Sequence, residues 1–174
     1  DLATLETHQY AYDNYLADTA KAYNASEILA LNGHEFLVLE RDGKGRGDGS
    51  SAVVKRLYKI DLANATDVSD VSGEANLLPL AVPKTLFLDI VSVLNAHGIG
   101  SNDIPAKLEG IAFGPDVDVN GVTKHTLFVA NDNDFVGTVT DSNHPTGIDN
   151  PNRFFVVGVD AADVPAFQPQ QLAS

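Results

Sequence analysis

Acidic and amide side chains gather directly after an apolar run in the second half of the chain. Ala130-Asn131-Asp132-Asn133-Asp134-Phe135 follows Leu127-Phe128-Val129, so a strand would end in adjacent oxygen-bearing side chains. Upstream, Glu109 opens a second apolar run just before Gly110. Carboxylate and amide oxygens are the ligands that Ca²⁺ prefers in proteins. If the two strands pair antiparallel, Glu109 lies near Asp132, and we expect Glu109, Asp132 and Asp134 to be metal ligands.

The same acidic segment also suits an ordinary turn. Asn and Asp side chains accept hydrogen bonds from nearby backbone N–H groups and tolerate left-handed backbone conformations, which makes them frequent in turns. Spacing alone does not decide between a calcium site and a turn at residues 130–135.

A second candidate site lies where another apolar run ends, at Leu39-Glu40-Arg41-Asp42-Gly43. An arginine guanidinium suits bidentate contact with a phosphate group, and the flanking carboxylates suit a metal or the orientation of the arginine. We therefore expect Glu40 and Arg41 to be catalytic residues, with Arg41 also contacting the substrate and Glu40 orienting Arg41. The alternative is an ion pair that only fixes the end of the strand.

Several familiar chemistries find no support in the sequence. The five histidines form no i, i+4 pair and no His-Glu-x-x-His motif, and no Gly-x-Ser-x-Gly motif is present. The glycine-rich segment 42–50 lacks the Gly-Lys-Ser/Thr ending of a P-loop and the spacing of an EF-hand, so we expect a flexible connection there. With no cysteine, the chain has no disulfide and no thiolate metal site.

The composition of the chain limits the classes of partner that it can bind. Twenty-four acidic against eleven basic residues give a net charge of -13, which repels nucleic acids and anionic membranes. No apolar run approaches the roughly 20 residues that cross a bilayer. We expect neither nucleic acid nor membrane as a partner. Asn24 and Asn64 begin N-glycosylation triplets, which matter only in a secreted eukaryotic protein.

The apolar pattern predicts short strands separated by Gly, Asn and Asp. Asn32-Gly33 between residues 27–31 and 35–40 is a strong signal for a hairpin with a type I′ turn. Residues 54–62 alternate as a half-buried strand with Lys55 on the polar side, and residues 8–12 suit a fourth strand. A second set of strands is expected at these positions: 85–89, 108–113, 125–131 and 153–159. Residues 90–97 suit a short helix closed by Gly98.

These elements predict an all-β fold with about two four-stranded antiparallel blades of a β-propeller. We expect residues 1–174 to be a single-domain fragment, with blades at about 7–62 and 84–160 and a loosely attached tail at 161–174. Two blades do not close a ring, so another chain or a missing segment would supply the remaining blades. The alternative is a sandwich of two sheets.

The order of several segments resembles the phytase-like family, also described by an esterase-like activity of phytase. The resemblance covers roughly residues 7–160, and its most specific parts are Glu40-Arg41-Asp42-Gly43 and Asp132-Asn133-Asp134-Phe135. The other matching segments are Glu27-Ile28-Leu29-Ala30-Leu31, Phe36-Leu37-Val38-Leu39, Lys55-Arg56-Leu57-Tyr58-Lys59-Ile60-Asp61-Leu62, Pro83-Lys84-Thr85, Glu109-Gly110-Ile111-Ala112 and Arg153-Phe154-Phe155.

The resemblance is to the C-terminal half of such a protein, and it implies a secreted or periplasmic β-propeller. It also implies calcium and phosphate bound by carboxylates at one end of the central channel. We therefore expect part of a calcium-dependent phosphoric ester hydrolase of phytase-like or esterase-like type, acting on a small phosphate ester. Its partner would be a polypeptide that carries the N-terminal propeller blades. The alternative function is a non-catalytic, calcium-stabilised propeller module for binding or scaffolding.

Overall fold

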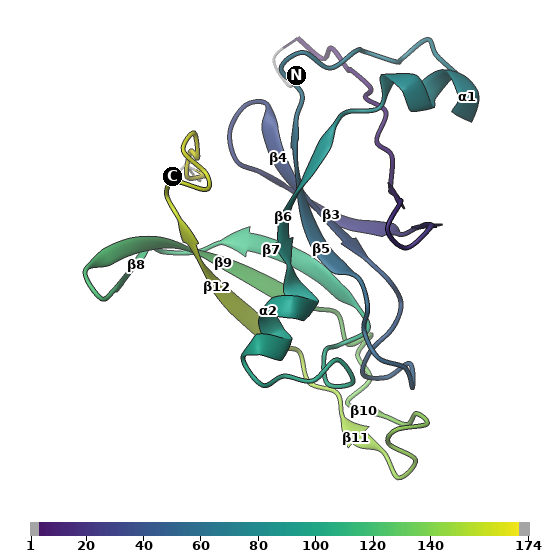
Figure 1. Ribbon diagram of the computed structural model, residues 1–174, viewed down its shortest axis with the longest axis vertical. Helices are drawn as coiled ribbons and strands as arrows, with labels where there is room; N and C mark the ends of the chain where they lie inside the picture. The colour runs from purple at the N-terminus through teal and green to yellow at the C-terminus, as the bar shows by residue number, and fades with distance from the viewer. Residues whose placement is uncertain (1–3, 171–174) are drawn as a thin grey trace.

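The structure, a computed structural model that describes residues 4–170, is built mainly of antiparallel β-strands (Figure 1). In the first sheet the strands follow the order of the sequence, and each pairs antiparallel with the next. Its members are β3 (Asn24–Ala30), β4 (Glu35–Arg41), β5 (Lys55–Asp61) and β6 (Lys84–Asp89).

The second sheet also contains four strands, in the order β12-β9-β7, with β8 paired to the first part of β9. Lys124 of β9 faces Asp160 of β12 on one side and Val117 of β8 on the other, so β8 extends the line of β7. The sheet is therefore only three strands wide. Its members are β7 (Leu108–Phe113), β8 (Val117–Val119), β9 (Val122–Asn131) and β12 (Phe154–Asp160).

Smaller elements connect the sheets. The helix α2 (Ile90–Ala96) starts at Asp89, whose side chain accepts a hydrogen bond from the Ser92 N–H at 2.9 Å. Gly98, with φ of 83°, follows its end, as predicted. The remaining elements are the hairpins β1 (Tyr15–Leu16) with β2 (Lys21–Ala22) and β10 (Thr138–Val139) with β11 (Ile148–Asp149), the helix α1 (Glu74–Leu77) and a 3₁₀ turn (Leu78–Leu80). Within residues 4–170 no helix is long and apolar enough to cross a membrane.

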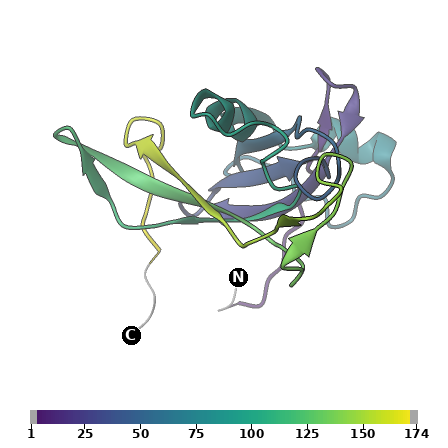
Figure 2. The ribbon, with the colours of Figure 1, turned by 90° about the horizontal axis from the view of Figure 1, so that it is seen from below.

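The main core lies between the two sheets and is covered on one side by α2 (Figure 2). Each sheet turns one apolar face inward. The buried members of this core include Leu37, Leu39 and Leu57 from the first sheet, Ile111, Leu127, Val129 and Val159 from the second, and Ile90, Val91 and Leu94 from α2. The two sheets and α2 therefore share this main core.

The expected antiparallel sheets are present, but their membership differs from the prediction. Residues 85–89 belong to β6 of the first sheet, whereas the sequence pattern predicts them in the second. Residues 8–12 form no strand. Their backbone crosses the molecule, with the Gln9 and Ala11 carbonyls each accepting one hydrogen bond at 2.8 Å. The alternation that identifies a strand carries no information about its neighbour, so the pattern could not separate the two arrangements.

The hairpin at Asn32-Gly33 is confirmed, but its turn type is not. A type I′ turn needs positive φ at both central residues, and neither Asn32 nor Gly33 has one. Instead the Asn32 side-chain oxygen accepts hydrogen bonds from the N–H groups of His34 and Glu35, at 3.0 and 2.9 Å. An Asx-type turn therefore connects β3 and β4.

The tail is packed onto the domain as far as the structure describes it. Val164 is buried, the Phe167 ring lies 4.2 Å from the Phe113 ring, and the Gln168 N–H donates to the Leu31 carbonyl at 2.8 Å. The prediction of a loosely attached tail is thus wrong for 161–170, and residues 171–174 lie outside the described residues.

Candidate functional site

The antiparallel pairing of β7 with β9 brings the two acidic segments together, as predicted. Leu108 faces Asn131, and the Asp132 N–H donates to the Lys107 carbonyl at 3.0 Å. The register shifts between Leu108 and Gly110, so Glu109 is the extra residue of a β-bulge. Because a bulge redirects the side chain of its extra residue, Glu109 leaves the regular alternation of β7.

Glu109 forms an ion pair with Arg41 at the end of β4. The Arg41 side chain is only 11% exposed, and its second contact is a long hydrogen bond to the Asp42 carbonyl, at 3.4 Å. Its Nε atom is buried and has no hydrogen-bond partner. The guanidinium is thus nearly buried, and Glu109 is its only carboxylate partner among the described residues.

Glu40 does not orient Arg41, in contrast to the prediction. Adjacent residues of a strand point to opposite faces, and Glu40 lies on the face of the first sheet that is turned away from Glu109. Its fully buried carboxylate accepts hydrogen bonds from the Tyr12 hydroxyl and the Lys84 ammonium, both at 2.5 Å. Burial first, and then this hydrogen bond, raise the pKa of Tyr12 far above its usual value. Glu40 thus fixes the segment around Tyr12.

Asp42 forms a buried ion pair with Lys55, whose Nζ atom lies 2.9 Å from the carboxylate. The Lys55 ammonium also donates to the carbonyls of Asp42 and Ala106, at 2.8 and 2.6 Å. The prediction that Lys55 lies on a polar, half-exposed face is wrong, because this side chain is fully buried. Asp42 additionally accepts from the N–H groups of Val53 and Val54, each at 2.9 Å, so both of its oxygens are engaged.

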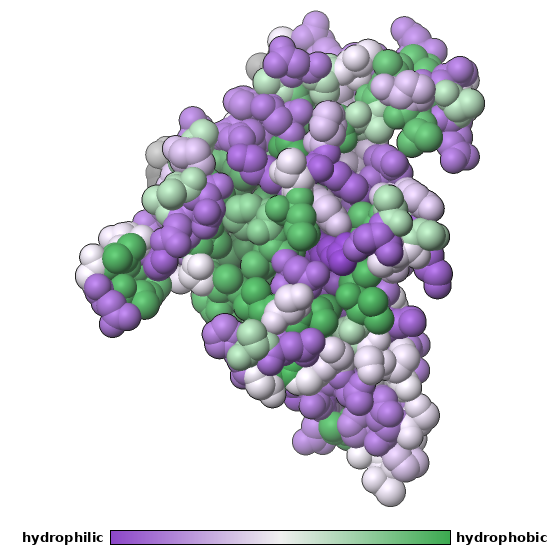
Figure 3. Space-filling model, viewed as in Figure 1, coloured by the Kyte–Doolittle hydropathy of each residue, from purple (hydrophilic) through white to green (hydrophobic). Residues whose placement is uncertain are grey.

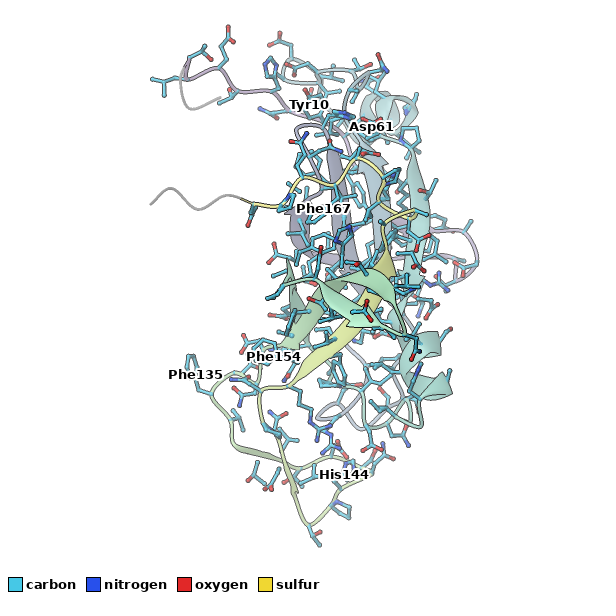
Figure 4. The ribbon with its side chains drawn as sticks, turned by 90° about the vertical axis from the view of Figure 1, so that its left-hand side faces the viewer. Tyr10, Asp61, Phe135, His144, Phe154 and Phe167 are labelled. Atoms are coloured by element: carbon cyan, nitrogen blue, oxygen red, sulfur yellow. The ribbon has the colours of Figure 1, made fainter. Side chains whose placement is uncertain are left out.

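The acidic segment after β9 forms a turn. Asp132 accepts a hydrogen bond from the Asp134 N–H at 2.8 Å, and Asn133 accepts one from the Phe135 N–H at 3.1 Å. Asp134 and Phe135 both adopt the left-handed conformation, with φ of 52° and 58°. The Phe135 ring points away from the body of the molecule (Figure 4). These contacts are those of an ordinary turn, the alternative to a calcium site that the spacing of residues 130–135 left open.

The three predicted metal ligands do not form a calcium site by themselves. Glu109 is paired with Arg41, and Asp134 with the Lys107 ammonium at 2.5 Å. The hydrogen bond with Asp134 first, and then the nearby negative charges of Asp134, Glu109 and Asp132, raise the pKa of Lys107. Within residues 4–170 no group of three or more His, Asp or Glu side chains is arranged to hold a metal ion. Ca²⁺ takes six to eight oxygens, so other ligands would have to complete such a site.

A cavity of about 390 Å³ opens beside Arg41, between the β1–β2 hairpin and the loop after β4. Lys21 and Lys44 line it together with Arg41. Among the described residues every other lysine and arginine except Arg153 is paired with a carboxylate, whereas Lys21 and Lys44 have no such partner. In a chain with more than twice as many acids as bases, two unpaired cations beside Arg41 make this cavity a candidate anion site.

Sequence reasoning found Arg41 but missed both lysines. Lys44 lies in the glycine-rich segment, which was expected to be only a flexible connection. In fact this loop is docked: the Arg46 N–H donates to the Ile104 carbonyl at 2.8 Å, and the Arg46 guanidinium pairs with Asp103 at 2.7 Å. The sequence feature that could have identified Lys44 is its position two residues after Asp42. No sequence feature could have identified Lys21, because its two-residue strand is too short to show a periodicity.

Comparison with known proteins identifies one family. The family model described as "Phytase-like: Esterase-like activity of phytase" matches residues 1–135, which include Lys21, Arg41, Lys44, Glu109 and Asp132. No curated protein and no solved structure matches the chain. The match indicates a hydrolase of phytase-like or esterase-like type.

Proposed function

The chain belongs to the phytase-like family, and from this premise we propose that it is part of a secreted or periplasmic hydrolase of phosphate esters. The observation that carries the proposal is the cavity that is lined by Arg41, Lys21 and Lys44. A phosphate group carries up to two negative charges, and these cations offset them where the surrounding protein is strongly negative.

Arg41 is the proposed substrate contact, and Glu109 is the group that orients it. The ion pair holds the guanidinium in place, and a phosphate oxygen would contact the part of the Arg41 side chain that stays exposed at the cavity. The two lysines are longer-range contacts, because ammonium groups bind phosphate as point charges rather than in a fixed fork. Positive charge beside the scissile ester would stabilise the charge that develops on the phosphate oxygens during attack by water.

The calcium dependence, the propeller and the partner remain parts of the proposal. Asp132 is the only predicted calcium ligand that forms no ion pair among the described residues, so a calcium ion would bind there with ligands from outside the chain. We propose that the two sheets are blades, and that a polypeptide carrying the remaining blades supplies those ligands and completes the site.

A non-catalytic binding module is the second candidate function. It is favoured by Asp42, the only carboxylate that lines the cavity, because both of its oxygens are already bound by Lys55 and by backbone N–H groups. The cavity therefore binds an anion without a free general base of its own. In this case phosphate would bind and no ester would be cleaved.

Charge removal in the cavity tests the function. With the chain alone, Lys21→Gln and Lys44→Gln should each weaken calorimetric binding of inorganic phosphate several-fold, and Arg41→Lys more strongly, because it loses the fixed fork. Lys59→Gln removes a cation that is paired with Glu35 elsewhere, and should leave binding unchanged. Equal affinity in all variants would contradict the site.

Turnover separates the two candidate functions. The protein assembled with its remaining blades should release phosphate from para-nitrophenyl phosphate, and a chelator should abolish the release. Release that persists in chelator would remove calcium from the proposal. Phosphate binding without any release would instead support the binding module.

A further inference from the structure

The outer edge of β12 is unpaired within the described residues. β12 pairs with β9 on one side only, so alternate residues direct their N–H and C=O groups away from the sheet. Two of its apolar side chains are largely exposed, Phe154 at 69% and Val156 at 53%, and Figure 4 shows Phe154 at the margin of the molecule. Such an edge is a template for another strand.

The edges of the first sheet are protected, whereas β12 is not. β3 has a bulge between Ala25 and Glu27, and its Ser26 hydroxyl donates to the Leu108 carbonyl of β7 at 3.1 Å. β6 begins with Lys84 and ends with Asp89, and bulges and terminal charges both discourage the addition of a strand. β12 carries a charge only at its last residue, Asp160, and from Phe154 to Val159 it contains no charge, no proline and no register shift.

A groove runs along this unprotected edge. Five consecutive residues of β12, from Phe154 to Gly158, line one side of a cavity of about 510 Å³. The other side is formed by α2 and the residues after it: Val93, Leu94, His97 and Ile99. Figure 3 shows a continuous hydrophobic surface over this part of the molecule. The groove has the length of a short strand, and it offers apolar contacts to the side chains on one face of that strand.

The charges at the two ends of β12 are complementary to each other. Arg153 precedes the strand and forms no ion pair among the described residues. Burial, followed by the nearby charge of Arg46, lowers the pKa of Arg153, and the charge of Asp103 offsets these effects only in part. At the other end Asp163 is exposed and also has no ion-pair partner within residues 4–170. An antiparallel strand that fits both ends therefore begins with a cation and ends with an anion, as β12 itself does.

We propose that two copies of the chain pair antiparallel through β12, about a two-fold axis near Val157. Each Arg153 then lies beside the Asp163 end of the other copy, and Val156 faces Gly158, which leaves room for close approach. The outward N–H and C=O groups of both edges pair, and one continuous sheet crosses the dimer. Two-fold contacts of this kind are the commonest in homo-oligomers. The net charge of each copy is screened beyond about 8 Å at physiological salt, so it does not prevent the contact.

Sedimentation velocity of the chain over a range of concentrations tests the proposal. The unchanged chain should show a monomer–dimer equilibrium, and Val156→Lys should weaken dimerisation at least about tenfold, because its ammonium would face the same strand of the other copy. Arg153→Asp and Asp163→Arg should each weaken it, and the double variant should restore it. Val122→Lys, at a similarly exposed valine in another strand, should change nothing.

Hydrogen exchange locates the contact independently of the variants. Amides of β12 should become protected as concentration rises, while those of β8 should not. A monomer at every concentration up to hundreds of micromolar would overturn the proposal, as would dimers whose β12 amides stay unprotected. Capture of a strand from a different polypeptide at β12 would also overturn it, since the edge would then serve a heteromeric contact.

Discussion

At the scale of single residues, the ion pair of Asp42 and Lys55 organises the end of β4 beside the candidate site. Taking two charges out of water is expensive, and only close hydrogen bonds offset that cost. Here Lys55 donates to three oxygens, and Asp42 accepts from the backbone of Val53 and Val54 as well. The pair therefore holds the loop after β4 in place, and with it Lys44, whose N–H donates to Asp42 at 3.3 Å.

Removal of one partner should be much more harmful than the strength of a surface ion pair suggests. Lys55→Met leaves the Asp42 carboxylate buried without its cation, and we expect the free energy of unfolding to fall by about 3–5 kcal/mol. Lys59→Met breaks the more accessible pair with Glu35 and should cost about 1 kcal/mol or less. Urea denaturation measures both, and equal losses would contradict this account.

The same pair predicts a response to acid. Burial alone would raise the pKa of Asp42, but the hydrogen bonds from Lys55 and from the Val54 N–H outweigh it and lower the pKa below the usual 3.8. A carboxyl whose pKa is depressed by folding stabilises the protein above its unfolded pKa, and this stability is lost as pH falls through the folded pKa. In Lys55→Met the pKa of Asp42 should rise instead. Protonation of Asp42 in acid should then no longer lower the free energy of unfolding of the variant.

Predictions about single residues were confirmed where strand pairing alone determines the position of the residue. Glu109 lies beside the Asp132 segment because antiparallel pairing of two apolar runs has only a few registers. The sequence could not reveal that Glu40 and Arg41 lie on different faces of β4, because Lys84 and Glu109, the residues with which they form ion pairs, are distant in the chain. Nor could it reveal that Lys55 is buried, because a lysine in an alternating pattern ordinarily faces water.

At the scale of elements, the docked loop between β4 and β5 links the two sheets. Its Gly45 has φ of 127° and lies so close to β7's leading segment that an added Cβ would approach the Ile104 carbonyl oxygen to 2.2 Å. A side chain at this position meets both backbone strain and a steric clash with backbone. The loop was expected to be flexible because composition reports turn propensity and not contacts made elsewhere.

A matched pair of glycines tests how strongly this loop is held. Gly45→Ala should destabilise the protein by more than about 1 kcal/mol, because the loop must move away from Ile104. Gly33→Ala, where an added Cβ meets nothing within 4 Å and φ is not positive, should be nearly neutral or slightly stabilising. Thermal melting of the two variants provides the comparison, and a neutral Gly45→Ala would mean that the loop is not docked in solution.

The sequence pattern predicts where most strands lie, but it does not predict which strands pair with each other. Periodicity located β3, β4, β5, β7, β9 and β12, because alternation of apolar residues is a local property. The assignment of β6 to the first sheet depends on Leu88 facing Leu57 in the core, a contact between residues on different strands. The short hairpins and α1 have too few residues for any period to be recognised.

At the scale of the whole molecule, apolar surface remains on the side of the first sheet that faces away from the main core. Ile28 and Leu86 are exposed there, at 56% and 54%. A largely apolar cavity of about 520 Å³ lies beside Ile28, bordered by Tyr10, Tyr12 and Val82. Surface of this kind on a sheet usually marks a contact with another layer of protein. It is the face on which we expect a further propeller blade to pack.

The last prediction concerns that blade. A polypeptide that carries the remaining blades should form a non-covalent complex with this chain and raise its melting temperature, because binding to the folded state alone stabilises it. Ile28→Lys should abolish the increase, since it would bury an unpaired ammonium. Val119→Lys, at an exposed valine of the second sheet, should not affect it. Light scattering and thermal melting measure the effect. If the chain alone is instead a monodisperse, cooperatively unfolding monomer, both sheets are already complete as a sandwich, and the propeller arrangement is wrong.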